Sequence, residues 1–187
     1  HILGAAFLEL VVTEEGTSTT LVFSGDLGRP GALLVPDAEK PASPDWLFVE
    51  STYGDRNHKG EADTLDELAE AVAYSHSRRE KVIIPTFAVE RTQEILYSLI
   101  QLRDQGRLPA DMPIYVDSPL AIRATDLFLK HEDHLHTPGG DGLAAVKDPN
   151  YNIRYTLSTQ ESQALNTMKG PAVILSASGM CNAGRIK

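Results

Sequence analysis

Apolar and polar positions follow one another in two different ways along this chain, and the change falls near residue 61. Before it, β-rich segments at 5–12 and 19–24 flank a polar stretch at 13–18, a pattern that predicts two strands joined by a hairpin loop. The short segment 46–50 is almost fully apolar, as strands in buried sheets are. The amino-terminal part is therefore predicted to be β-structure.

From Glu61 onward, apolar residues recur at helical spacing and alternate with short apolar runs, which indicates helices followed by buried strands. Such alternation implies crossover connections between parallel strands, in an open α/β sheet that binds ligands at the carboxyl ends of its strands. The first predicted helix begins at Glu61, and the later ones cover 90–105, 120–131 and 158–168. The predicted strands cover 82–84, 113–117 and 172–176, and a Gly-rich loop covers 139–142.

Polar groups stand at four predicted strand ends, where the local pattern does not require them. They are Asp26, Glu50, the pair Asp117–Ser118, and the segment 176–179. Carboxylates at such positions suit metal binding or proton transfer, because the sheet fixes them while the loops admit a substrate. A single aspartate of this kind is more often a turn or helix-capping acid, so none of these positions decides the function by itself.

Composition narrows the class of protein. The 187 residues are 42% hydrophobic and 23% charged, which predicts one or two globular units. The single cysteine, Cys181, excludes an internal disulfide framework, and no apolar run reaches the ~20 residues that span a bilayer. We therefore expect a cytoplasmic protein without membrane association. A net charge of −9 disfavours a broad basic face for nucleic acid but leaves room for a locally positive cleft.

Several familiar motifs are missing or misplaced. Segment 176–185 is rich in Gly and Ser and ends in Arg, which suits a phosphate, yet it lacks a Walker Lys-Ser/Thr, and the chain has no G-x-G-x-x-G. A free-standing nucleotide-binding module is therefore disfavoured. The histidines of segment 131–136 lack the spacing of a helical H-E-x-x-H site, which predicts a polar helix end, and His58 is expected on the surface.

Six sequence blocks, taken in order, resemble successive motifs of the β-CASP family of metallo-β-lactamase-fold nucleases. That family includes the endonuclease that processes the 3′ ends of eukaryotic messenger RNA, together with bacterial and archaeal relatives. Six blocks in the right order are far more specific than any one of them. The blocks are His1–Ala6, Ser24–Arg29, Val49–Arg56, Ile84–Glu94, Tyr115–Leu120 and Ala177–Arg185.

The resemblance implies a fold and a division into domains. We expect an α/β protein that contains part of a metallo-β-lactamase αββα sandwich and a β-CASP domain with a mainly parallel sheet flanked by helices. Residues 1–52 would belong to the sandwich, 53–176 to the β-CASP domain, and 177–187 to the return into the sandwich.

The resemblance also implies two zinc ions in the parent enzyme, meaning the full-length protein that carries this sequence. His1 resembles a histidine ligand, and Asp26 resembles the carboxylate that bridges both ions, where it would help to activate one hydroxide. Glu50 resembles an acidic residue beside the metal site, whose carboxylate orients a ligand imidazole. Asp26 and Glu50 are therefore the predicted catalytic residues.

Single-stranded RNA is the implied substrate, and the remaining blocks are expected to contact it by hydroxyl groups, an aromatic face and cations. Whether the enzyme forms a homodimer, and whether it cleaves as an endonuclease or an exonuclease, stays open. The predicted substrate-binding residues are Thr86, Phe87, Arg91, Ser118, Ser178, Gly179 and Arg185.

The chain departs from the family pattern because the H-x-H-x-D-H block and two later histidine motifs do not occur in it. We expect them before His1 and after Lys187, and we expect the isolated chain to bind zinc poorly and to be inactive. Two alternatives remain at this stage. One is a hydrolase of the same fold acting on DNA or a small phosphodiester, and the other is an inactive homologue that serves as an RNA- or protein-binding scaffold.

Overall fold

The computed structural model describes residues 1–41, 43–57, 60–136 and 142–187. The described chain forms two compact units, each treated by itself below. Unit 1 contains residues 1–57 and 134–136, and unit 2 contains residues 60–133 and 142–187. His58 and most of the predicted Gly-rich loop at 139–142 lie outside the described residues.

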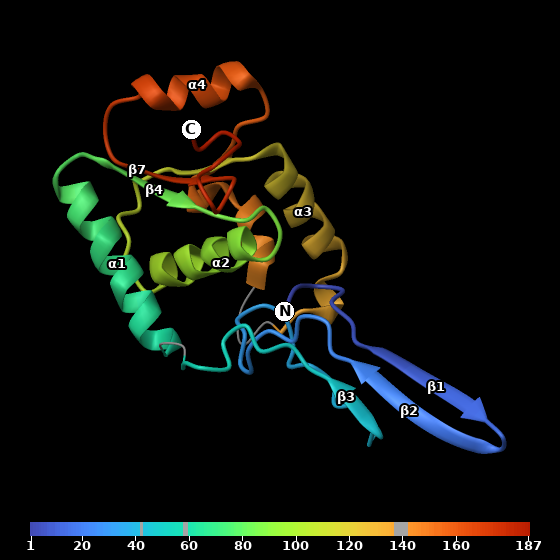
Figure 1. Cartoon of the computed structure of the whole chain (residues 1–187). Coiled ribbons are helices and arrows are strands. Elements are labelled where there is room, and N and C mark those ends of the chain that lie inside the picture. Colours follow the sequence, from blue (N-terminus) through green and yellow to red (C-terminus); the bar gives the residue numbers. More distant parts are fainter. Residues whose placement is uncertain (42, 58–59, 137–141) are drawn as a thin grey trace. The chain divides into compact units, whose positions relative to one another are not determined.

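Unit 1 is built on a three-stranded sheet of order β1-β2-β3, shown in blue to cyan in Figure 1. Strands β1 (Leu8–Glu14) and β2 (Thr17–Phe23) pair antiparallel, and β3 (Trp46–Phe48) runs parallel to β2. The rings of Phe23 and Phe48 stack with centroids 4.6 Å apart.

The hairpin of unit 1 is tighter than the sequence pattern predicts. The ladder continues to the pair Glu14 and Thr17, so the turn consists of Glu15 and Gly16 and not of the whole segment 13–18. Both turn residues have positive φ, 48° and 82°. A two-residue turn of this kind matches the right-handed twist of the strands that it joins, and the paired polar residues therefore extend the strands.

The prediction that segment 46–50 is a buried strand is wrong for this chain. The strand is shorter, and its three side chains are 52–63% exposed. The physical reason is the lack of a second layer, because the described part of unit 1 contains no α-helix. Its buried apolar residues are Val22, Leu34 and Val35.

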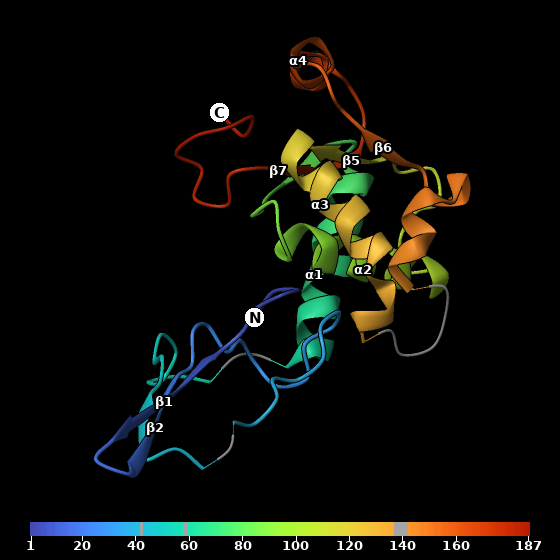
Figure 2. The same ribbon diagram turned by 90° about the vertical axis from the view of Figure 1, so that its right-hand side faces the viewer.

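Unit 2 confirms the predicted parallel sheet. Its strands have the order β4-β7-β5-β6, and all three neighbouring pairs are parallel. Helix α4 lies on one face of this sheet and α1 and α2 lie on the other (Figures 1 and 2). The strands are β4 (Lys81–Pro85), β5 (Ile114–Asp117), β6 (Ile153–Tyr155) and β7 (Ala172–Ser176), and the helices are α1 (Glu61–Ser77), α2 (Arg91–Asp104), α3 (Pro119–Lys130) and α4 (Thr159–Thr167).

Three short helical turns and strand β6 are absent from the predicted helices and strands. The strand has three residues, which are too few to show a period. The turns are 3-10 helices at Glu132–His134, Gly142–Lys147 and Pro149–Tyr151. The first of them follows the end of α3 at Lys130 and has no buried residue, which agrees with the prediction that the histidine-rich segment is a polar helix end.

The core of unit 2 lies between its sheet and helices. Strand β7 is buried along its whole length, and the facing side of α2 contributes Leu96, Leu99 and Leu102. On the other face, Leu165 of α4 packs with Ala172 and Ile174. This packing fixes the carboxyl ends of the strands, where the predicted substrate residues lie. Among the described helices, none is long and apolar enough to cross a membrane.

Candidate functional site

The first candidate site lies in unit 1, in the loop that follows β2. The imidazole Nε2 of His1 and the carboxylate Oδ2 of Asp26 are 3.7 Å apart, and both side chains are exposed. The backbone nitrogen of His1 donates a hydrogen bond to the Leu27 carbonyl at 3.1 Å. The fold therefore brings together the two residues predicted to bind metal, although they are far apart in the chain.

Glu50 braces the loop that carries Asp26. Its carboxylate accepts hydrogen bonds from the backbone N–H groups of Leu27 at 3.1 Å and Thr52 at 3.3 Å. The Thr52 hydroxyl and backbone, followed by the Leu27 backbone, lower the pKa of Glu50 below 4.5. Glu50 is therefore held as an anion. Its backbone N–H also donates to the Ser24 hydroxyl at 3.0 Å, so the ends of β2 and β3 are joined on this side.

Gly28 permits the close approach of His1 to this loop. It has a φ of +77°, and a Cβ atom at this position would lie 2.6 Å from the His1 backbone nitrogen. No other residue type fits here without moving the backbone. The position of the His1 imidazole thus depends on a glycine as well as on the Glu50 carboxylate.

The donor atoms of His1 and Asp26 fit one side of a zinc site. An imidazole nitrogen and a carboxylate oxygen are usual zinc ligands, and two ligands about 2.0–2.1 Å from a tetrahedral ion lie roughly 3.3 Å from each other. The observed 3.7 Å is close to that spacing. Within the described residues, however, no group of three or more His, Cys, Asp or Glu side chains could hold a metal. A catalytic zinc requires at least one further protein ligand.

The second candidate site lies in unit 2, at the carboxyl edge of the sheet. Asp117, the last residue of β5, is buried, and its carboxylate accepts hydrogen bonds from Thr156 Oγ1 at 2.5 Å and Ser162 Oγ at 2.8 Å. Arg185 Nη1 contacts the same carboxylate at 3.0 Å. Arg185 therefore has a protein partner for its charge.

Apart from Arg185, the predicted substrate residues of unit 2 fall into two groups. In the first group the side chain is buried and used within the protein. The Thr86 hydroxyl pairs with the Thr92 hydroxyl at 2.9 Å, and Ser118 caps α3 by accepting from the Ala121 N–H at 3.2 Å. These two residues shape the strand ends, and a hydroxyl contact with substrate would require them to exchange partners.

The second group is accessible. The Phe87 ring is exposed, and a Cβ atom added to Gly179 would lie 3.0 Å from that ring, so the glycine backbone rests against it. Arg91 is exposed as well and forms an ion pair with Glu94 at 2.9 Å. The hydroxyl of Ser178 donates to the Asn182 side chain at 3.1 Å. Phe87 and Gly179 thus lie against each other, and Arg91 is the first residue of α2, shortly after Phe87 in the chain.

Sequence reasoning missed Thr156 and Ser162 as partners of Asp117. They lie 39 and 45 positions from it in the chain, and neither belongs to a block that resembles the family. A hydroxyl residue just after an unrecognised strand, and another in the first turn of α4, were the only available signals.

The comparisons with known proteins add independent evidence. The profile of the Beta-Casp domain matches residues 92–187, more than half of the chain. The chain belongs to the β-CASP family. Its mixed α/β structure, with a parallel sheet flanked by helices, agrees with the metallo-β-lactamase/β-CASP fold expected from the sequence.

Relatives of this β-CASP chain include named ribonucleases. Over 188 residues it is 39% identical to Ribonuclease TTHA0252 of Thermus thermophilus, with 100% of this chain and 42% of the relative covered. It is 33% identical to an RNase J-like protein of Methanocaldococcus jannaschii, with the same coverage. It is 26% identical to the Cleavage and polyadenylation specificity factor 73 of Drosophila melanogaster, covering 98% of this chain and 26% of the relative. The chain thus spans less than half the length of these relatives.

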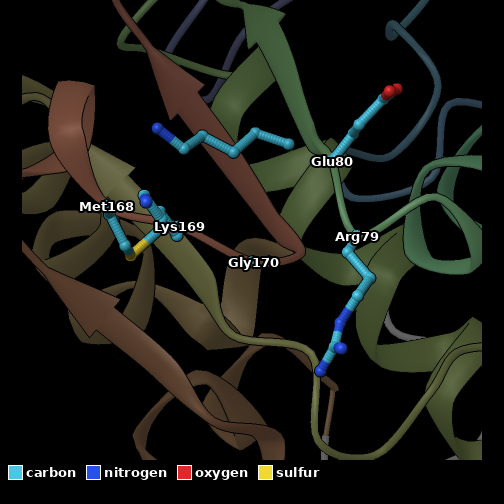
Figure 3. Close-up of a pocket in the computed structure, with 6 residues that line it drawn as sticks. Arg79, Glu80, Met168, Lys169 and Gly170 are labelled. Atoms are coloured by element: carbon cyan, nitrogen blue, oxygen red, sulfur yellow. The ribbon is translucent and has the colours of Figure 1, made fainter.

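A surface pocket of about 610 Å³ in unit 2 does not include the residues around Asp117. It borders the amino ends of β4 and β7, the opposite end of the strands from Asp117. Figure 3 shows the Arg79 and Glu80 side chains pointing in opposite directions. Lys81 Nζ donates to the Leu165 carbonyl at 2.5 Å and is thereby engaged with the end of α4. The lining residues are Arg79, Glu80, Lys81, Met168, Lys169 and Gly170.

Proposed function

We propose that the parent protein of this β-CASP chain is a zinc-dependent ribonuclease that hydrolyses RNA phosphodiester bonds. The observation that carries this proposal is the 3.7 Å approach of His1 Nε2 to Asp26 Oδ2 in an exposed loop. The ribonuclease names of its relatives support the choice of RNA as substrate.

Within this proposal, His1 and Asp26 provide two ligands of a zinc site that needs further ligands from elsewhere in the parent protein. Bound zinc would supply a hydroxide nucleophile at neutral pH and stabilise negative charge on the phosphate. Asp26 holds its place because Glu50 fixes the neighbouring Leu27 N–H. Glu50 therefore acts on the metal site through the loop. The isolated chain, with two donors, is expected to retain little zinc and to be inactive.

We assign unit 2 to the binding of single-stranded RNA. The exposed Phe87 ring can stack on a base, and the Gly179 backbone beside it lets a strand approach closely. The exposed Arg91 guanidinium can share its charge between Glu94 and a phosphate. The Ser178 hydroxyl is a further donor for phosphate. Thr86 and Ser118 contribute to the same edge chiefly by position, since their hydroxyls are buried and paired.

A cytoplasmic location is part of the proposal. The chain has one cysteine, and that residue, Cys181, is exposed as a free thiol. A free exposed thiol suits a reducing compartment.

The deciding experiment compares the full-length wild type with its Asp26→Ala variant. Cleavage of an end-labelled single-stranded RNA and of the matching DNA is measured, and zinc is quantified in both proteins. We expect RNA-selective cleavage by the wild type, and in the variant a loss greater than the ~10–100-fold that follows removal of a residue supporting a ligand. Asp37→Ala is the matched control, because Asp37 is also an exposed carboxylate of unit 1 that accepts a backbone hydrogen bond, from Gly31 at 2.7 Å.

Other outcomes separate the competing functions. DNA cleavage by a zinc-loaded wild type would replace the RNA substrate by DNA, and cleavage of neither polymer would favour a small phosphodiester. A folded wild type without zinc that still binds RNA would support a scaffold and contradict the ribonuclease. The size distribution of the labelled products distinguishes endonucleolytic from exonucleolytic cleavage.

A further inference from the structure

The ion pair between Asp117 and Arg185 is enclosed by the protein. The side chain of Asp117 is 5% exposed and that of Arg185 is 20% exposed. The carboxylate receives three donors, from Arg185, Thr156 and Ser162. The removal of either charge would leave the other enclosed without compensation.

The guanidinium of Arg185 is engaged on more than one side. Besides the carboxylate, Nη1 donates to the Thr156 carbonyl at 2.8 Å and Nη2 donates to the Leu157 carbonyl at 2.8 Å. These carbonyls belong to the connection between β6 and α4. Such forked, charge-assisted contacts fix both the position and the plane of an arginine. Arg185 therefore ties the end of its own segment to two strands of the sheet.

The segment held in this way, residues 177–187, is a closed loop. Three backbone hydrogen bonds cross it, from Ser178 N–H to the Ala183 carbonyl, from Cys181 N–H to the Ser178 carbonyl, and from Ile186 N–H to the Ala177 carbonyl. At its other end Gly179 rests against the Phe87 ring. The loop is thus fixed at one end by Arg185 and presents Ser178 and Gly179 at the other.

We propose that Asp117 and Arg185 form a latch that sets the position of loop 177–187, and that they act on RNA cleavage as positioning residues. Arg185 then serves the substrate through Gly179 and Phe87, and not by binding a phosphate itself. The inference rests on the ribonuclease function proposed above for its kinetic test, and on the contacts of unit 2 alone for its structural test.

The two roles of Arg185 predict different kinetics. If Arg185 bound phosphate directly, its loss would raise KM and would reduce the slope of log affinity against log salt concentration by about 0.7, the contribution of one phosphate contact on a single strand. Asp117→Asn would then do little harm, since the cation stays. If the pair is a latch, Asp117→Asn and Arg185→Met have the same effect, because each releases the same loop.

The test uses the full-length zinc-loaded enzyme and single-stranded RNA at several salt concentrations. For a latch, we expect each single variant to lose on the order of 10–100-fold in kcat/KM, as misplacement of a substrate-binding element does. The double variant should lose no more than either single variant, with the salt slope unchanged. Arg123→Met is the neutral control, an exposed arginine of α3, and Arg91→Gln is the control for a lost phosphate contact.

Hydrogen exchange provides a readout that does not depend on activity. In the Asp117→Asn enzyme, the amides of Ser178, Cys181 and Ile186 should exchange at least tenfold faster, while amides of β7 stay protected. Should Asp117→Asn fail to fold, Thr156→Val removes one donor and keeps the ion pair, and it should give a smaller change of the same kind. Unchanged exchange, or additive losses with a reduced salt slope in Arg185→Met, would overturn the latch. Faster exchange in a protein without nuclease activity would support the latch and overturn the ribonuclease.

Discussion

The two units of this chain place similar residues in opposite surroundings. Val11 in β1 of unit 1 is 62% exposed, whereas Val173 in β7 of unit 2 is 1% exposed. Both are valines within β-strands, and each has apolar neighbours in its strand. The difference is the layer of helices that covers each face of the unit 2 sheet. An apolar segment in a sequence predicts a strand, but its side chains are buried only where a second layer of structure packs against the sheet.

Two aspartates that follow strands extend the comparison. The Asp26 side chain is 73% exposed with an imidazole beside it, and the Asp117 side chain is 5% exposed with three donors around it. The first carboxylate is accessible to a cation in solution, whereas the second already accepts hydrogen bonds from three protein side chains. The same sequence signal thus marks a candidate metal ligand in one unit and a structural anchor in the other.

The largest expected effect is on the core of unit 2. Leu175→Ala, at a fully buried position of β7, should lower the free energy of unfolding by ~2–5 kcal/mol. Val11→Ala in unit 1 should change it by less than ~0.5 kcal/mol, because the side chain is largely exposed. Urea denaturation of the 187-residue chain measures both, with the helical circular dichroism reporting unit 2 and the fluorescence of Trp46, the single tryptophan, reporting unit 1. Equal effects would remove the contrast between the units.

The next effect concerns the loop of unit 1. Gly28→Ala should destabilise the parent protein by more than the ~1–2 kcal/mol of a positive φ alone, because its Cβ would collide with the His1 backbone. Gly16→Ala is the matched control, with a φ of +82° and no atom within 4 Å of the added Cβ. Thermal unfolding and zinc content are measured together. Zinc retained in full by Gly28→Ala would separate this loop from the metal site.

A smaller effect is expected at the start of α4. The Ser158 hydroxyl accepts a hydrogen bond from the Glu161 N–H at 3.2 Å, and the Glu161 carboxylate accepts from the Ser158 N–H at 2.7 Å. Ser158→Ala should therefore cost unit 2 ~1 kcal/mol of unfolding free energy. Gln160→Ala, at an exposed position of the same turn, is the control and should be neutral in the same denaturation experiment.

The smallest effect is the pH dependence of this helix cap. Hydrogen bonds from the Ser158 backbone, the Ser158 side chain and the Leu157 backbone lower the pKa of Glu161 below 4.5. A carboxyl group with a lower pKa in the folded state stabilises the fold above pH 4.5, and this contribution is lost as the pH falls through the folded pKa. The difference in unfolding free energy between the wild type and Glu161→Gln should therefore shrink below pH 4.5. A difference that grows in acid would contradict the cap.

The regular elements of unit 2 were predictable because their signal is local. Strand β7 was predicted at residues 172–176, where the structure has it, and the bounds of α2, α3 and α4 lie within two residues of the predicted ends. A periodic apolar face is repeated every few residues, so a short window contains it. Strand β6 and the two-residue hairpin turn gave no such repeat and were missed.

The candidate sites were predictable in part, for a different reason. The proximity of His1 and Asp26 followed from the resemblance to a family, since no local pattern links them. The partners of Asp117 were not foreseen because Arg185 lies 68 positions away and Ser162 lies 45 positions away. Contacts between distant strand ends depend on the order of strands in the sheet, which the sequence pattern does not contain.

The order β4-β7-β5-β6 also has a kinetic consequence. Strand β7 is the last strand of the sheet in the chain, yet it lies between β4 and β5. Its first residue, Ala172, pairs with Lys81, which precedes it by 91 positions. Strands β4 and β5 each pair with β7, so neither pairing can form until β7 has been synthesised. The sheet is therefore completed by long-range contacts, which form slowly. Refolding of unit 2 should accordingly take milliseconds to seconds. During translation, β4 and β5 remain without this pairing partner until β7 has been synthesised.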